Sequence, residues 1–114
     1  MGKVNLLVKY CLINEKSEYN IKGILVNDVI KYLDGENMMF LYLKENKLKR
    51  ETKDSEILFD FNKGTCNIRN KQDNNLIDFK IIVQELKNDN NNFYVKYKII
   101  EDEVFEVFIS FLPI

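Results

Sequence analysis

Apolar and polar residues alternate along most of this chain, in short segments that are separated by polar turns. In residues 93–100, for example, Phe93, Val95 and Tyr97 are spaced two apart and are separated by residues such as Lys96. Successive side chains of a β-strand point to opposite faces, so this period of two is typical of strands with one buried face. Such segments recur about every 8–12 residues, a spacing that predicts an all-β protein.

The turns between these segments favour an antiparallel sheet. Asp34-Gly35 is a pair common in type I′ turns, because glycine adopts a positive φ without steric cost, and Asn27-Asp28 indicates a second tight turn. We expect one closed antiparallel barrel of about 8–10 strands over residues 1–114, because closure removes aggregation-prone edges. The predicted strands are residues 4–13, 18–26, 29–33, 38–44, 47–52, 56–61, 65–69, 76–86, 93–100 and 104–112, with residues 101–103 as the last turn.

One segment also fits a helix. Between residues 20 and 33 the apolar positions fall near helical spacing, and Gly35 could cap a helix there. Gly23 and the Asn27-Asp28 pair would be poor residues inside a helix, and the segment is rich in β-branched residues. The pattern therefore favours strand–turn–strand over the helical alternative.

The alternating rows also predict a hydrophobic core. Each strand contributes the row of its larger apolar residues, and the last third of the chain contributes the most regular rows. We expect the core to contain Phe59, Phe61, Phe79, Ile81, Phe93, Val95, Tyr97, Val107, Ile109 and Phe111.

Composition narrows the classes of function. The chain has no histidine, which removes the usual general base near neutral pH and the commonest zinc ligand, so we expect no enzyme, metal or cofactor. A net charge of −1 argues against a nucleic-acid partner. No apolar run is long enough for a membrane span, and no signal peptide is evident, so we expect a cytoplasmic protein with Cys11 and Cys66 as reduced thiols.

Basic residues gather in one predicted hairpin, together with Phe40 and Tyr42. Such a face resembles a nucleic-acid surface, but Glu45, Glu51 and Asp54 interleave with the basic residues, which favours a solvated surface. An exposed aromatic or basic strand face would also suit a protein-interaction or adaptor module without catalysis. The basic residues are Lys44, Lys47, Lys49, Arg50 and Lys53.

The order of segments is similar to a known family. The specific part comprises residues 23–25, Tyr32, residues 40–50 and residues 56–64. It resembles the uncharacterised bacterial family typified by the YwiB protein, which implies a calycin-like (lipocalin-like) β-barrel for residues 4–111. Arg50 fits the arginine of that family's Arg-x-Gly-like element, with Thr52 in place of the glycine, and Phe61 with Gly64 fits its Phe-x-x-Gly-like turn.

Arg50 is the main candidate for a binding role. It shares a strand face with Leu48, whereas Lys47, Lys49 and Glu51 share the other, so Arg50 should point into the barrel or its mouth. One hypothesis is that Arg50 anchors an anion in an apolar pocket with Tyr42, Phe59 and Tyr97, which would bind a small-molecule or lipid-like ligand. The alternative is that Arg50 pairs with Asp60 or Asp78, or reaches back to solvent along its own stem.

Overall fold

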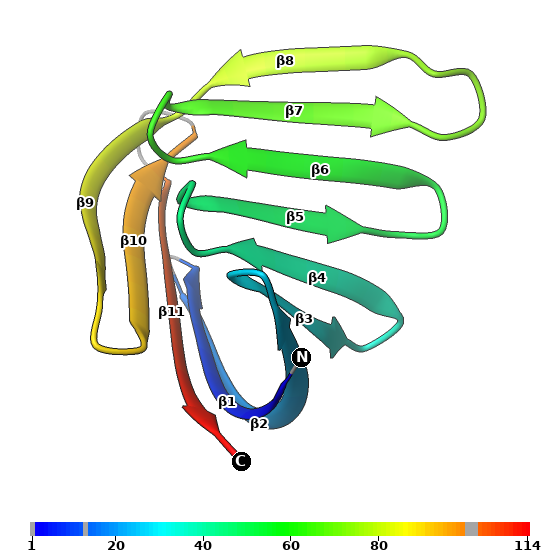
Figure 1. The fold of residues 1–114 in the computed structure, drawn as a ribbon. Helices are drawn as coiled ribbons and strands as arrows, with labels where there is room; N and C mark the ends of the chain where they lie inside the picture. Colours follow the sequence, from blue (N-terminus) through cyan, green and yellow to red (C-terminus); the bar gives the residue numbers. More distant parts are fainter. Residues whose placement is uncertain (1, 13, 100–102) are drawn as a thin grey trace.

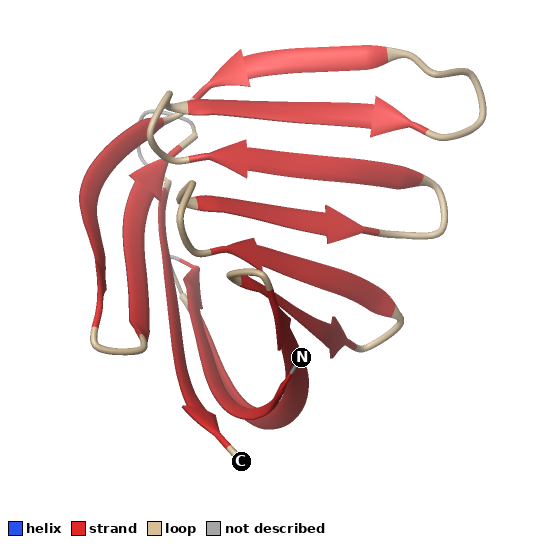
Figure 2. Cartoon of the chain, in the orientation of Figure 1, coloured by secondary structure: helices blue, strands red, loops and turns tan. Residues whose placement is uncertain are grey.

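A computed structural model describes residues 2–12, 14–99 and 103–114, and in these residues it contains eleven β-strands and no helix (Figure 2). All strand pairs are antiparallel. The strands are β1 (Gly2–Leu12), β2 (Glu15–Val26), β3 (Val29–Asp34), β4 (Asn37–Tyr42), β5 (Lys47–Glu51), β6 (Ser55–Asp60), β7 (Thr65–Asn70), β8 (Leu76–Lys80), β9 (Ile82–Asp89), β10 (Asn92–Lys98) and β11 (Val104–Pro113).

The strands form one continuous sheet in the order β8-β7-β6-β5-β4-β3-β2-β1-β11-β10-β9. The sheet curls over on itself, so that β4 to β8 form one layer and β9 to β11 cross it as a second layer (Figure 1). The long strands β1 and β2 curve strongly and connect the two layers, because β2 pairs with β3 and β1 pairs with β11. The two edge strands, β8 and β9, come together at a corner without pairing with each other, which leaves the barrel nearly closed.

The prediction of an antiparallel all-β protein is confirmed, but the strand count is higher than expected. Residues 76–86 were predicted as one strand, whereas the chain turns sharply at Ile81 between β8 and β9. The Ile81 N–H donates to the Gly64 carbonyl at 3.0 Å, which is the last hydrogen bond of the β7–β8 ladder, and the Ile81 side chain is buried in the corner. The predicted strand ends at Ile13 and Ile100 and the predicted turn residues 101–102 lie outside the described residues.

The φ angles in two hairpin turns define the type of each turn. Asn27 and Asp28 have φ angles of 50° and 65°, the pair of positive values that a type I′ hairpin requires, so the helical alternative for residues 20–33 is wrong. In the Gly35-Glu36 turn only Gly35 has a positive φ, 63°. That pattern belongs to a type II′ turn, so the predicted type I′ assignment is corrected.

The core fills the space between the two layers. Phe61 of the first layer lies 6.0 Å from Phe93 and 5.4 Å from Tyr97 of the second, measured between ring centroids. Most residues predicted as core are buried, but Phe59 and Phe79 are only half-buried. The reason differs between them, since Phe59 borders a pocket and Phe79 lies on an edge strand.

Candidate ligand-binding pocket

A pocket of about 340 Å³ lies on the inner face of the barrel, near the end of β5. Its walls come from β1 to β6, β10 and β11, so the curling of the sheet creates it. Most of the lining is apolar. Its principal apolar residues are Met39, Leu48, Phe59, Ile99, Phe105 and Val107, and its charged residues are Asp34, Arg50 and Glu106.

Arg50 lies at the rim of this pocket. It follows buried Leu48 on the same face of β5, as the alternation indicates, and its side chain remains exposed. When the amide oxygen of Asn37 is oriented toward Arg50, it accepts hydrogen bonds from Arg50 Nε at 3.3 Å and from Arg50 Nη2 at 2.7 Å. A neutral amide therefore orients the guanidinium and leaves its positive charge available.

Neither ion pair that was considered for Arg50 forms among the described residues. Asp60 is buried, accepts hydrogen bonds from the backbone N–H groups of Asn62 and Lys63 at 3.1 and 3.0 Å, and has Lys47 Nζ at 3.9 Å. Asp78 lies on the outer face of β8, opposite Asn67. The alternative in which Arg50 pairs with either carboxylate is wrong.

Phe59 and Tyr97 both line the pocket and form an aromatic wall. Their ring centroids are 5.4 Å apart, and Phe105 stacks on Tyr97 at the same distance. Burial raises the pKa of the Tyr97 phenol, with a smaller contribution from Cys66. The phenol is therefore neutral at physiological pH and can donate a hydrogen bond.

Tyr42 does not line the pocket, which corrects its predicted place beside Arg50. In β4 the buried residues are Met39 and Leu41, so Tyr42 lies on the opposite, outer face, paired with Lys47 of β5. Both faces of β4 carry large apolar residues, and alternation alone therefore did not identify the inner one.

A cluster of tyrosines beside Arg50 was missed at the sequence level. The hydroxyls of Tyr10 and Tyr32 are 3.0 Å apart, and the Tyr19 ring lies 6.2 Å from that of Tyr10. The Tyr19 hydroxyl is buried without a hydrogen-bond partner among the described residues. Burial is the main cause that raises the pKa of all three phenols, so they too are neutral donors. The available signal was that Tyr10 continues the inward row of Val4, Leu6 and Val8.

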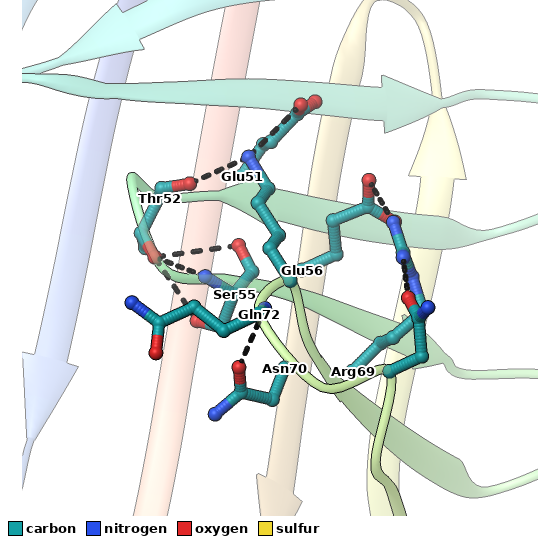
Figure 3. A network of polar contacts seen from close by, with 9 residues as sticks. Glu51, Thr52, Ser55, Glu56, Arg69, Asn70 and Gln72 are labelled. Carbon is teal, nitrogen blue, oxygen red and sulfur yellow. Dashed lines mark hydrogen bonds and ion pairs between the residues drawn. The ribbon is translucent and has the colours of Figure 1, made fainter.

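The strand ends next to Arg50 are held by a polar network (Figure 3). Thr52 Oγ1 accepts a hydrogen bond from the Ser55 N–H at 3.0 Å and closes the β5–β6 turn. Lys71 Nζ donates to the Thr52 carbonyl at 2.7 Å and pairs with Glu51 at 3.3 Å, which ties this turn to the β7–β8 loop. Arg69 pairs with Glu56 at 2.8 Å and lowers the pKa of that carboxyl. Thr52 thus has a turn-closing role where the resembled family has glycine.

The other candidate features have local explanations. Lys49 lies 4.3 Å and Lys31 5.6 Å from the centroid of the outward Phe40 ring, while Lys44 and Lys47 pair with Asp28 and Glu45. Cys11 is a half-buried free thiol and Cys66 a buried one. No group of three or more His, Cys, Asp or Glu side chains in the described part of the chain could hold a metal ion.

Comparisons of the chain with protein-family models, curated proteins and solved structures found no match. The resemblance to the YwiB-like family therefore stays a prediction. Within residues 2–12, 14–99 and 103–114, no helix is long and apolar enough to cross a membrane.

Proposed function

We propose that the protein binds a small, mainly apolar ligand that carries one anionic group, with Arg50 as the anchor of the anion. The observation that carries this proposal is the position of Arg50. Its guanidinium lies at the rim of an apolar pocket and is oriented by neutral Asn37. Ligand sites are commonly apolar cavities of about 300–1,000 Å³ with a few placed polar groups, and this pocket fits that description.

Arg50 is the group that favours an anionic ligand in this lining, which also contains the carboxylates of Asp34 and Glu106. Arg50 offers donors that match the two oxygens of a carboxylate or sulfonate, and such charge-assisted bonds are stronger than neutral ones. Tyr10 and Tyr97 line the same pocket as neutral phenols. They can donate hydrogen bonds to an anion without repelling it.

A pair of fluorescent probes tests this function. 8-Anilinonaphthalene-1-sulfonate carries the anionic group, and N-phenyl-1-naphthylamine is the matching apolar molecule without it. We expect the parent protein to bind both probes. Arg50→Leu should bind the sulfonate about 10- to 100-fold more weakly, the loss typical of a hydrogen bond to a charged group, and should bind the neutral probe as the parent does.

Arg69→Leu is the matched control, because Arg69 is paired with Glu56 and does not line the pocket. It should leave the affinity for both probes unchanged. Thermal melting would establish that both variants remain folded. Equal affinity of Arg50→Leu and the parent for the sulfonate probe would overturn the role of Arg50, and failure of the parent to bind either probe would overturn the proposed function.

A further inference from the structure

Strand β8 leaves one edge of the sheet open. It pairs with β7 on one side, and no described strand pairs with its other side, which faces outward at the top of the view in Figure 1. Large apolar side chains are exposed along it and just beyond it, with Leu76 64%, Ile77 60% and Ile82 65% exposed. An uncovered edge with exposed apolar residues is a template for pairing with another strand.

The hydrogen bonds to β7 establish which backbone groups of β8 are free. The Ile81 N–H donates to Gly64 at 3.0 Å and the Asn70 N–H to Asn75 at 2.9 Å, at the two ends of the β7–β8 ladder. Hydrogen-bonded pairs recur every second residue of an antiparallel ladder, so Phe79 and Ile77 bond to β7. The N–H and C=O groups of Asp78 and Lys80 therefore point to the open edge.

The side chains of Asp78 and Lys80 carry opposite charges at this edge. Both are exposed on the outer face of β8, and neither forms an ion pair among the described residues. In the β7–β8 ladder they stand opposite uncharged Asn67 and Thr65. With the Asn67 amide nitrogen oriented toward it, Asp78 Oδ1 accepts a hydrogen bond at 3.3 Å from this uncharged neighbour. The edge thus presents one negative and one positive residue, each with free backbone groups.

We infer that β8 pairs with β8 of a second copy of this chain, antiparallel, across a two-fold axis at Phe79. This register places Asp78 opposite the partner's Lys80, and Lys80 opposite the partner's Asp78, so that both charges are matched. Each of these pairs exchanges two backbone hydrogen bonds. A two-fold axis makes the surface self-complementary, as in most homodimers.

The two neighbouring symmetric registers are less favourable than the one at Phe79. An axis at Asp78 would set two carboxylates directly opposite each other, which is destabilising. An axis at Ile77 would set Asp78 opposite apolar Leu76 and would require Asn74, with φ of 59°, to continue the strand. The register at Phe79 also places the two half-buried Phe79 rings side by side in a non-hydrogen-bonded pair, where side chains approach most closely.

Charge reversal tests both the partner and the register. Sedimentation velocity over a range of concentrations should show that the parent protein dimerises. Asp78→Lys and Lys80→Asp should each weaken the dimer at least tenfold, because like charges then face each other. The double variant Asp78→Lys/Lys80→Asp should restore the parent affinity, since it exchanges the two charges.

A parent protein that stays monomeric over the whole range would overturn the inference. So would single variants that dimerise as tightly as the parent, or a double variant that stays as weak as the singles. Lys53→Asp, an exposed reversal in the β5–β6 turn, is the control and should dimerise as the parent does. None of these residues lines the pocket at Arg50, so failure of this inference and failure of the proposed function are separate outcomes.

Discussion

Burial changes the acid–base chemistry of single residues in this protein. Cys66 is fully buried, and desolvation raises the pKa of its thiol from 9.0 to about 11. Burial likewise raises the pKa values of Tyr10, Tyr32 and Tyr97 above the ordinary 10.0. All four groups are neutral in the folded protein at physiological pH, and the folded state holds their protons more tightly than the unfolded state does.

This difference predicts a loss of stability in alkali. A raised pKa in the folded state contributes stability that is fully present below the unfolded pKa and is lost as pH rises through the folded value. The loss should begin near pH 9, where the unfolded thiol ionises, and steepen above 10.0, where unfolded tyrosines ionise. Urea denaturation should give a lower midpoint at about pH 10.5 than at about pH 8.

The range between pH 7 and 8 serves as the control, because none of these groups ionises there in either state. An equal urea midpoint at about pH 8 and about pH 10.5 would contradict the assigned burial of these four side chains.

At the residue level, alternation predicted side-chain direction well where one face is clearly polar. Arg50 shares the pocket-lining face of β5 with Leu48, as expected from the charged residues Lys47, Lys49 and Glu51 on the other face. Tyr42 was placed wrongly because β4 is apolar on both faces. The contact of Tyr10 with Tyr32 depends on the pairing of β1, β2 and β3, which no local pattern specifies.

At the element level, turn residues determine where strands end. Asn27-Asp28 and Asn90-Asn91 both have the paired positive φ angles of type I′ hairpins, and asparagine and aspartate tolerate this conformation best after glycine. The sequence predicted the ends of the strands on both sides of Asn27-Asp28, and it predicted the start of β10 to within one residue. The corner at Ile81 was not, because the row of Ile77, Phe79, Ile81 and Val83 continues through it without a turn residue.

Gly35 offers a test of the turn that follows β3. Its φ of 63° is disfavoured for residues with a Cβ, while an added Cβ would meet no atom within 4 Å. Gly35→Ala should therefore reduce the free energy of unfolding by about 1–2 kcal/mol through the backbone alone. Gly2→Ala is the control, since Gly2 is equally open and has no positive φ, and it should change little.

Urea denaturation of both variants measures the difference. Gly35→Asn should lose less stability than Gly35→Ala, because asparagine adopts positive φ more readily. An alanine variant as stable as the parent would show that the turn does not need a left-handed residue at Gly35.

At the scale of the whole molecule, the fold depends on contacts that join the two layers of the sheet. Phe93 of β10 is fully buried against Phe61, which follows β6 in the opposite layer. The Asn88 amide of β9 also reaches across, donating to the Leu43 carbonyl at 2.6 Å and to Asn46 Oδ1 at 2.8 Å. These interlayer contacts hold the curled sheet around the pocket, since β8 and β9 do not close the barrel by pairing.

Truncation of two phenylalanines compares the interlayer core with the open edge. Phe93→Ala should reduce the free energy of unfolding by about 3–5 kcal/mol, a large share of the stability of a small protein, because it leaves a cavity between the layers. Phe79→Ala should cost less than half as much, because Phe79 is half-buried on the edge strand β8. The free energies of unfolding should be measured by urea denaturation at low protein concentration, where the proposed β8 dimer does not form and cannot stabilise either variant. Equal losses in the two variants would mean that the edge strand is as tightly packed as the contact between the layers, and a Phe93→Ala loss below about 1 kcal/mol would contradict the central position of Phe93.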